Sequence, residues 1–301
     1  MRKQTLALAA VLVILAGLGA YRFGAHRLFR KTPEPRVVPV AGESRVLPVA
    51  PAQPAFVRGS LETTTRTIQA AGRTRRYVEL VPRGRAVDPL PLVLVLHGDG
   101  GDAAGFHAAF PFEAASGDGA VLAYPDGVGH TWDLETTDQN PDVAFLAAVV
   151  DDVAGRSAID RDRVYAVGYS SGGFLANVTA CQRPGLLRAI SSSAGGAPYN
   201  QRESWPNGYP RCPGQKPVAT IALHGRRDFG VSFDSGKFTA MYWAYVNGCN
   251  EGEVETTGYP ECHAYTGCNP GRPVVFCDIA SLGHWVWDRG AVASWTFFNK
   301  L

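Results

Sequence analysis

Apolar residues from about position 60 onward occur in short runs, separated by longer segments with helical periodicity. The runs with the length of buried strands lie at residues 92–96, 120–123, 164–167, 189–193, 218–223 and 274–279. The segments expected to be helices lie at residues 143–153, 174–181, 233–247 and from about 291. Two further segments, 65–70 and 75–81, flank a turn and predict an opening β-hairpin. This alternation predicts an α/β fold with a mostly parallel sheet and helices on both faces.

Four polar residues follow directly after predicted strands, namely Asp99, Ser170, Asp228 and His284. The carboxyl ends of parallel strands meet at one edge of a sheet, and open α/β sheets bind their ligands there. We therefore expect the functional site to form at this edge.

Ser170 is the central residue of Gly168-Tyr169-Ser170-Ser171-Gly172, which matches the pattern G-x-S-x-G. A serine displayed on a sharp strand-to-helix turn needs minimal side chains two positions away on either side, and glycine meets that need. In a chain with 34 glycines the pattern alone is weak. Its place between a predicted strand and a predicted helix indicates a nucleophile rather than an ordinary turn serine.

The order Ser170, Asp228, His284 is the nucleophile–acid–base order of α/β-hydrolases. His284 would take the hydroxyl proton of Ser170, and Asp228 would orient the imidazole and stabilise its charged form. The backbone N–H groups of Ser171 and Asp99 would bind the oxyanion of the tetrahedral intermediate.

The acid and the base each have competitors, because catalytic acids move between strands in this fold. The competing acids are Asp126, Asp133 and Asp278. The competing bases are His224 and His263. His97 and His224 both precede a glycine at a strand end, which favours a role in bracing loops.

Three aromatic residues are candidates to line the substrate cleft: Tyr124, Trp132 and Trp285. Packing within loops is the alternative for each of them. Trp205 and Tyr209 lie in a Pro- and Gly-rich insertion, for which surface packing is expected.

The first 59 residues differ from the rest of the chain. Residues 1–21 combine a basic start with an apolar run and predict a signal peptide or a signal anchor. Residues 22–59 contain six prolines and predict an extended basic linker. Residues 60–301 are then the catalytic domain. An exported protein is expected, secreted or associated with the cell envelope, with a membrane tether if the N-terminal segment is retained.

Charge separates the same two parts of the chain. The first 59 residues hold nine Lys or Arg and two acidic residues, whereas the remainder holds 20 and 25. The acidic excess in the main body argues against nucleic acid as a partner.

All six cysteines lie between Cys181 and Cys277. The even count in an exported chain predicts up to three disulfides, with fifteen possible pairings. A metal site is not expected, because the sequence lacks paired short spacings such as C-x-x-C.

Motifs throughout the domain resemble those of one family. They are Leu96-His97-Gly98 with Gly100-Gly101, Tyr124-Pro125-Asp126-Gly127 with Trp132, residues 142–146 and 159–165, Gly168-Tyr169-Ser170-Ser171-Gly172-Gly173, Asn247-Gly248-Cys249, Tyr265-Thr266-Gly267-Cys268 and Gly283-His284. The chain resembles, from about Thr65 to its C-terminus, the secreted bacterial polyhydroxybutyrate depolymerase and feruloyl or acetylxylan esterase group of α/β-hydrolases. The resemblance implies an α/β-hydrolase fold and serine ester hydrolysis without a cofactor.

The resemblance also implies a disulfide pairing. Cys249 and Cys268 match a recurring pair of the family, which leaves two pairs for the remaining cysteines, Cys181–Cys212 and Cys262–Cys277.

Three positions depart from the family pattern. Ser171 stands where relatives usually have Asn, and Asp99 puts a carboxylate into the oxyanion loop, so we expect its side chain to face away from the oxyanion. Residues 285–288 replace the usual x-Trp-Pro-Gly after the histidine, which changes the rim beside the base.

Short or aromatic acyl esters are the expected substrates. The segment between Ser170 and Asp228 lacks a long apolar insertion of the kind that covers a lipase site, and Trp285 and Trp287 offer flat faces beside His284. A polyhydroxybutyrate-type polyester is the main alternative substrate, and a peptidase is a weaker one. A non-catalytic envelope binding domain on the same fold is the alternative of another class.

Overall fold

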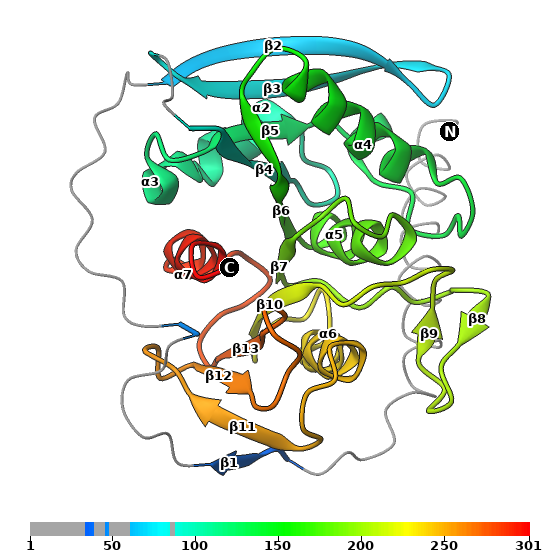
Figure 1. The fold of residues 1–301 in the computed structure, drawn as a ribbon, viewed down its shortest axis with the longest axis vertical. Helices are drawn as coiled ribbons and strands as arrows, with labels where there is room; N and C mark the ends of the chain where they lie inside the picture. Colours follow the sequence, from blue (N-terminus) through cyan, green and yellow to red (C-terminus); the bar gives the residue numbers. More distant parts are fainter. Residues whose placement is uncertain (1–33, 39–45, 48–60, 85–87) are drawn as a thin grey trace, which may run out of the picture.

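The computed structural model of the protein describes residues 34–38, 46–47, 61–84 and 88–301 (Figure 1). The predicted signal segment, 1–21, lies outside these residues, as does most of the predicted linker. Within the described ranges, none of the helices is long and apolar enough to cross a membrane.

The helices and strands follow the predicted alternation. In chain order they are β1 (Arg36–Val38), β2 (Leu61–Ala70), β3 (Arg73–Pro82), β4 (Leu90–Leu96), α2 (Ala103–Ala109), α3 (Glu113–Ser116), β5 (Val121–Pro125), η1 (Val128–His130), α4 (Pro141–Ala154), β6 (Ile159–Tyr169), α5 (Ser171–Gln182), β7 (Ala189–Ser193), β8 (Glu203–Ser204), β9 (Pro210–Arg211), β10 (Ala219–Gly225), α6 (Phe233–Val246), β11 (Glu253–Thr256), β12 (Cys262–Tyr265), β13 (Val274–Ile279) and α7 (Gly290–Phe298).

Within the described part of the chain, eleven strands form one sheet in the order β1-β11-β12-β13-β10-β7-β6-β4-β5-β3-β2. The six central strands, from β13 to β5, are parallel to one another. The β2–β3 hairpin is antiparallel at one edge, and β12 and β11 pair antiparallel toward the other. The predicted α/β fold with a mostly parallel sheet is confirmed.

Helices cover both faces of this sheet (Figure 1). Helices α4, α5 and α6 lie on one face and bury side chains such as Phe145, Leu175 and Phe238 against it. Helices α2, α3 and α7 lie on the other, where Phe112 and Trp295 are part of a second apolar core. Two buried layers account for the continuous apolar runs of the central strands, because both faces of each strand are covered.

Two described stretches of the predicted linker contact the domain. Strand β1 pairs in parallel with β11, with Arg36 opposite Glu253. Leu47 is fully buried, and its carbonyl oxygen accepts a hydrogen bond from the N–H of Gly258. An extended Pro-rich segment cannot continue a helix, but it can supply an edge strand, which pairs on one side only.

Three disulfides join Cys181 to Cys212, Cys249 to Cys268 and Cys262 to Cys277. These are the pairs that the family resemblance implies. The first ties the insertion that carries β8 and β9 to the C-terminal end of α5. The third joins the neighbouring strands β12 and β13, where its two cysteines lie directly opposite each other.

Candidate active site

The turn between β6 and α5 displays Ser170 in a left-handed backbone conformation, with φ 51° and ψ −121°. A side chain on Gly168 would place its Cβ 2.1 Å from the carbonyl oxygen of Gly172. A Cβ on Gly172 would lie 2.4 Å from the carbonyl oxygen of Leu96. Both glycines of the G-x-S-x-G pattern are therefore required by close backbone approach, which lets the turn present the serine hydroxyl at the sheet edge.

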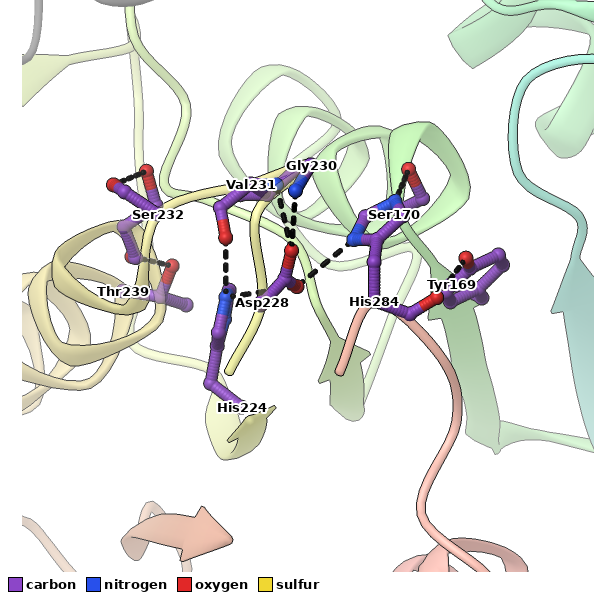
Figure 2. A network of polar contacts seen from close by, with 10 residues as sticks. Tyr169, Ser170, His224, Asp228, Gly230, Val231, Ser232, Thr239 and His284 are labelled. Carbon is purple, nitrogen blue, oxygen red and sulfur yellow. Dashed lines mark hydrogen bonds and ion pairs between the residues drawn. The ribbon is translucent and has the colours of Figure 1, made fainter. Parts of the chain in front are cut away.

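Ser170, His284 and Asp228 meet at this edge in a continuous chain of hydrogen bonds (Figure 2). The Nε2 atom of His284 lies 3.0 Å from Oγ of Ser170, and its Nδ1 atom lies 2.8 Å from Oδ2 of Asp228. Ser170 follows β6, Asp228 follows β10 and His284 follows β13. Strands β6 and β13 lie on either side of β7 and β10, so the parallel topology joins residues 114 positions apart in the chain.

Asp228 is held by several donors. Its Oδ1 atom accepts hydrogen bonds from the N–H groups of Gly230 and Val231, both at 2.8 Å. Its Oδ2 atom also lies 3.3 Å from Nε2 of His224, whose side chain is fully buried. Burial alone raises the pKa of Asp228, but the hydrogen bonds from His224 and His284 outweigh it and hold the pKa far below that of an ordinary aspartate.

The imidazole of His284 is enclosed from two sides (Figure 2). On one side a Cβ on Gly230 would lie 2.8 Å from Cγ of the ring, so only glycine fits there. On the other side the Tyr169 ring lies 5.2 Å from the imidazole, and its hydroxyl donates to the carbonyl oxygen of His284 at 2.8 Å. Burial raises the pKa of Tyr169 to about 12, so the hydroxyl remains a donor at neutral pH.

The loop after β4 lies directly against Ser170. A Cβ on Gly98 would be 3.1 Å from Cβ of Ser170 and 2.9 Å from the Tyr169 ring. Ser171 is the first residue of α5, so its N–H is among those that a helix leaves without an internal acceptor. The carboxylate of Asp99 accepts a hydrogen bond from Oγ1 of Thr131 at 2.6 Å. This bond holds the charged group against the loop after β5.

His97 and Trp132 hold the loop after β4 against the loop after β5. The Nδ1–H group of His97 donates to the carbonyl oxygen of Gly98, and its Nε2 accepts from the N–H of Gly127. Burial lowers the pKa of His97, in agreement with this neutral form. Trp132 is 5 % exposed and donates to the carbonyl oxygen of His97. Trp132 thus supports the loop after β4 and offers little surface to a substrate.

Tyr124, a predicted cleft residue, and Trp287, whose ring was expected to offer a flat face beside His284, lie in the core instead. Tyr124 is 0 % exposed, and its hydroxyl accepts from the N–H of Phe112 and contacts Glu113. Trp287 is 4 % exposed and packs against Tyr259. The assignment of Tyr124 to the cleft is wrong because α2 and α3 cover the end of β5. Trp285, in contrast, is 47 % exposed.

The competing acids have partners of their own elsewhere. Asp126 pairs with Arg76, and Asp278 pairs with Arg226. Asp133 accepts N–H groups of its own loop, from residues 135 and 136. Among the competing bases, His224 lies on the far side of Asp228 from Ser170, and His263 is part of β12 (Figure 2).

The β8–β9 part of the insertion between β7 and β10 packs against α6. Tyr209 contacts Phe238, Tyr242 and Tyr245 on α6, and the Trp205 ring lies 5.8 Å from that of Tyr245. Because Tyr245 is in the last turn of α6, this part of the insertion extends along that helix.

Sequence reasoning missed one residue that contacts Asp228 and one exposed aromatic residue next to Asp228 in the chain. His224 appeared only as a loop residue or a competing base, and Phe229 was not singled out at all. Phe229 directly follows Asp228 and is 92 % exposed. The only signal in the sequence was its position beside the predicted acid, since exposure cannot be read from a single aromatic residue.

Comparisons with known proteins agree with this geometry. Residues 91–233 match the family described as alpha/beta hydrolase fold. The chain is 34 % identical over 219 residues to a putative esterase, NocK, of Nocardia uniformis subsp. tsuyamanensis, covering 65 % of this chain and 60 % of that protein. It is 26 % identical over 233 residues to feruloyl esterase B of Piromyces equi, covering 70 % of this chain and 42 % of that protein. The chain thus spans less than two thirds of either relative.

Among solved structures, the acetyl xylan esterase from Aspergillus awamori matches with a TM-score of 0.65 at 19 % identity, over 79 % of this chain and all of that one. The protein therefore has the α/β-hydrolase fold that the sequence predicted. By sequence it is similar to proteins named as an esterase and a feruloyl esterase. Its resemblance to polyhydroxybutyrate depolymerases stays a prediction.

Proposed function

We propose that this protein is an exported serine esterase that hydrolyses short or aromatic acyl esters through an acyl-enzyme. The observation that carries the proposal is the hydrogen-bonded chain from Ser170 through His284 to Asp228, with distances of 3.0 and 2.8 Å. A binding protein has no need to keep a nucleophile, a base and an acid within hydrogen-bonding distance of one another. This hydrogen-bonded arrangement has the geometry of nucleophilic catalysis by a serine hydroxyl.

In the first half-reaction, Oγ of Ser170 attacks the ester carbonyl carbon while Nε2 of His284 takes the hydroxyl proton. The negative charge that develops on the carbonyl oxygen is stabilised by the N–H groups of Ser171 and Asp99. The intermediate collapses as the bond to the alcohol oxygen breaks, and His284 returns the proton to that oxygen. The alcohol leaves, and the acyl group remains on Ser170.

In the second half-reaction, a water molecule gives its proton to His284 and attacks the acyl carbon. The bond to Oγ of Ser170 then breaks, Oγ regains the proton, and the carboxylic acid leaves. Asp228 stays ionised throughout and stabilises the imidazolium formed in both halves. Its low pKa supports this role, because a protonated aspartate could not offset the charge.

The substrate class is supported by the segment between Ser170 and Asp228. It carries no long apolar insertion of the kind that covers a lipase site, and its Tyr209 packs on α6. Similarity to a feruloyl esterase by sequence supports an aromatic acyl group. The three disulfides support export, since such bonds persist in oxidising compartments.

The test is labelling with a fluorophosphonate, which reacts with an activated serine. Wild-type protein should be labelled at Ser170, and the Ser170→Ala variant should not. Specificity constants for methyl ferulate, a 3-hydroxybutyrate oligomer, p-nitrophenyl acetate and p-nitrophenyl palmitate then rank the substrates. Absence of labelling would favour a binding domain, and preference for the oligomer would favour a polyester depolymerase.

A further inference from the structure

The backbone of His284 is held by a side chain from another part of the sheet. Residues 280–289, between β13 and α7, form neither helix nor strand. Within the part of the chain that the structure describes, His284 takes part in no backbone–backbone hydrogen bond. Its carbonyl oxygen accepts instead from the hydroxyl of Tyr169, at 2.8 Å (Figure 2). A segment without regular structure is thus attached to the sheet at the base itself.

Tyr169 is the last residue of β6 and directly precedes Ser170. Strand β6 pairs with β4 on one side and with β7 on the other, so its backbone is fixed by hydrogen bonds along both edges. Two consecutive residues therefore contact opposite ends of His284. Ser170 contacts the imidazole, and Tyr169, 115 positions before His284 in the chain, contacts its carbonyl oxygen.

The ring of Tyr169 is itself packed on several sides. Phe106 of α2 stacks on it with ring centroids 6.1 Å apart, and Trp285 packs edge-on at 5.0 Å. The imidazole of His284 lies 5.2 Å away. A Cβ on Gly98 would be 2.9 Å from the ring, so the loop after β4 closes a further side. Because neighbours surround the ring, the position of its hydroxyl is fixed relative to β6.

We propose, building on the esterase function above, that Tyr169 is a positioning residue that fixes the backbone of His284 and so keeps Nε2 within hydrogen-bonding distance of Ser170. Asp228 holds only Nδ1 of the ring, and a single bonded ring atom still allows the segment around it to shift. Proton transfer needs a separation of about 3 Å between Oγ and Nε2, and a displacement of about 1 Å can cost up to about 10²-fold in rate. An anchor on the backbone beside the nucleophile removes that freedom.

The experiment is Tyr169→Phe, which removes the hydroxyl and retains the packed ring. Its kcat for p-nitrophenyl acetate should fall by about tenfold, equivalent to ~1.4 kcal/mol. KM should stay within about twofold, because the hydroxyl contacts the backbone of His284. The second-order rate of fluorophosphonate labelling at Ser170 should fall by a similar factor. Replacing Tyr169 with 4-aminophenylalanine, which offers an N–H donor in the same place, should restore most of both rates.

Tyr165→Phe provides the matched control. Tyr165 lies on the same strand, about 13 Å before Tyr169, stacks on Phe298 and donates to its carbonyl oxygen at 3.4 Å. Both variants should lower Tm by a few degrees, because each loses one hydrogen bond to a backbone carbonyl. Only Tyr169→Phe should lower kcat and labelling. Equal kinetic losses in the two variants, a wild-type kcat in Tyr169→Phe, or a loss confined to KM would each overturn the positioning role.

A spectroscopic measurement separates this proposal from the esterase function. The proton between Nδ1 of His284 and Asp228 gives a low-field resonance, which is assigned by its loss in His284→Ala. Tyr169→Phe should broaden this resonance through faster exchange with water, and Tyr165→Phe should leave it unchanged. If the wild-type protein hydrolyses no ester, the esterase function fails, but the same comparison still decides the role of Tyr169. An unchanged resonance in Tyr169→Phe would overturn that role, whether or not the wild-type protein is active.

Discussion

The Nε2 atom of His224 lies 3.3 Å from Oδ2 of Asp228 and 3.1 Å from the carbonyl oxygen of Val231. A carbonyl oxygen can only accept, so Nε2 must carry the hydrogen atom and point it at both oxygens. Within the described residues, Nδ1 of the same ring has no hydrogen-bond partner. His224 is thus a buried donor to the oxygen that also accepts from His284.

His224 acts as a positioning residue for Asp228, and we predict that His224→Ala lowers kcat by about tenfold with little change in KM. A carboxylate with one donor fewer concentrates more charge on Oδ2 and favours the protonated form of His284. The acid limb of the pH–rate profile should therefore move to higher pH. Steady-state kinetics between pH 4 and 9 measure both effects.

The corresponding control is His263→Ala, which changes a histidine in β12 away from the triad. His224→Gln retains an N–H donor and should recover part of the lost rate. If His224→Ala changes only the melting temperature and leaves the pH profile in place, the residue is structural and the assignment is incorrect.

Ser170→Ala should abolish ester hydrolysis, with a loss of turnover of up to about 10⁶. Folding should be almost unaffected, because alanine keeps the same backbone and only the hydroxyl bond to His284 is lost. That bond is worth about 1 kcal/mol, which corresponds to a change in Tm of no more than about 4 °C. Calorimetry and the ester panel check both parts, and residual activity above a tenth of wild type would exclude Ser170 as nucleophile.

The pH dependence should show a single protonation on the acid side. Imidazole groups titrate near about pH 6.5, and a general base works only when neutral. The pKa of Asp228 is depressed, so its carboxylate is ionised throughout this range. Its contribution to folding stability is complete above the unfolded value of about 3.9 and is lost only at lower pH.

A plot of log kcat/KM against pH should therefore fall with unit slope below about pH 6. A slope of two would indicate that Asp228 titrates together with the base. Activity that stays level down to about pH 4 would exclude histidine as the base.

Removing the Cys181–Cys212 disulfide should destabilise the domain without greatly affecting catalysis. The bond closes a loop of 31 residues, which corresponds to about 3–4 kcal/mol in the chain-entropy estimate and to a fall in Tm of about 6–15 °C. The bond lies at the end of α5 remote from Ser170, so kcat at 25 °C should stay within about twofold. Cys181→Ala/Cys212→Ala is compared with wild type by calorimetry.

Alkylation without reduction controls this experiment. Neither wild type nor the double variant should expose a free thiol, because the other four cysteines stay paired. An unchanged melting temperature, or six reactive thiols in the wild-type protein, would contradict the prediction.

The chain order of the central strands and helices could be predicted from the sequence alone, as could the three residues joined in the Ser170–His284–Asp228 hydrogen-bonded chain. These features are local: apolar runs of strand length report burial on two faces, and the G-x-S-x-G pattern reports close approach within one turn. Ser170, Asp228 and His284 could be expected to lie close together because each follows a predicted strand, and parallel strands place all their carboxyl ends at one edge. The short strands β1, β11 and β12 carried too few residues for a pattern.

The burial of the aromatic side chains and the contact of His224 with Asp228 could be established only from the tertiary structure. Tyr124 and Trp287 are buried, whereas Phe229 and Trp285 are exposed, although all four follow strand ends or catalytic residues. Whether such a side chain is covered depends on distant segments that pack above it, as α2 and α3 do over Tyr124. The contact between His224 and Asp228 likewise depends on how the loop after β10 folds back, because sequence spacing gives a residue's position but not the direction of its side chain.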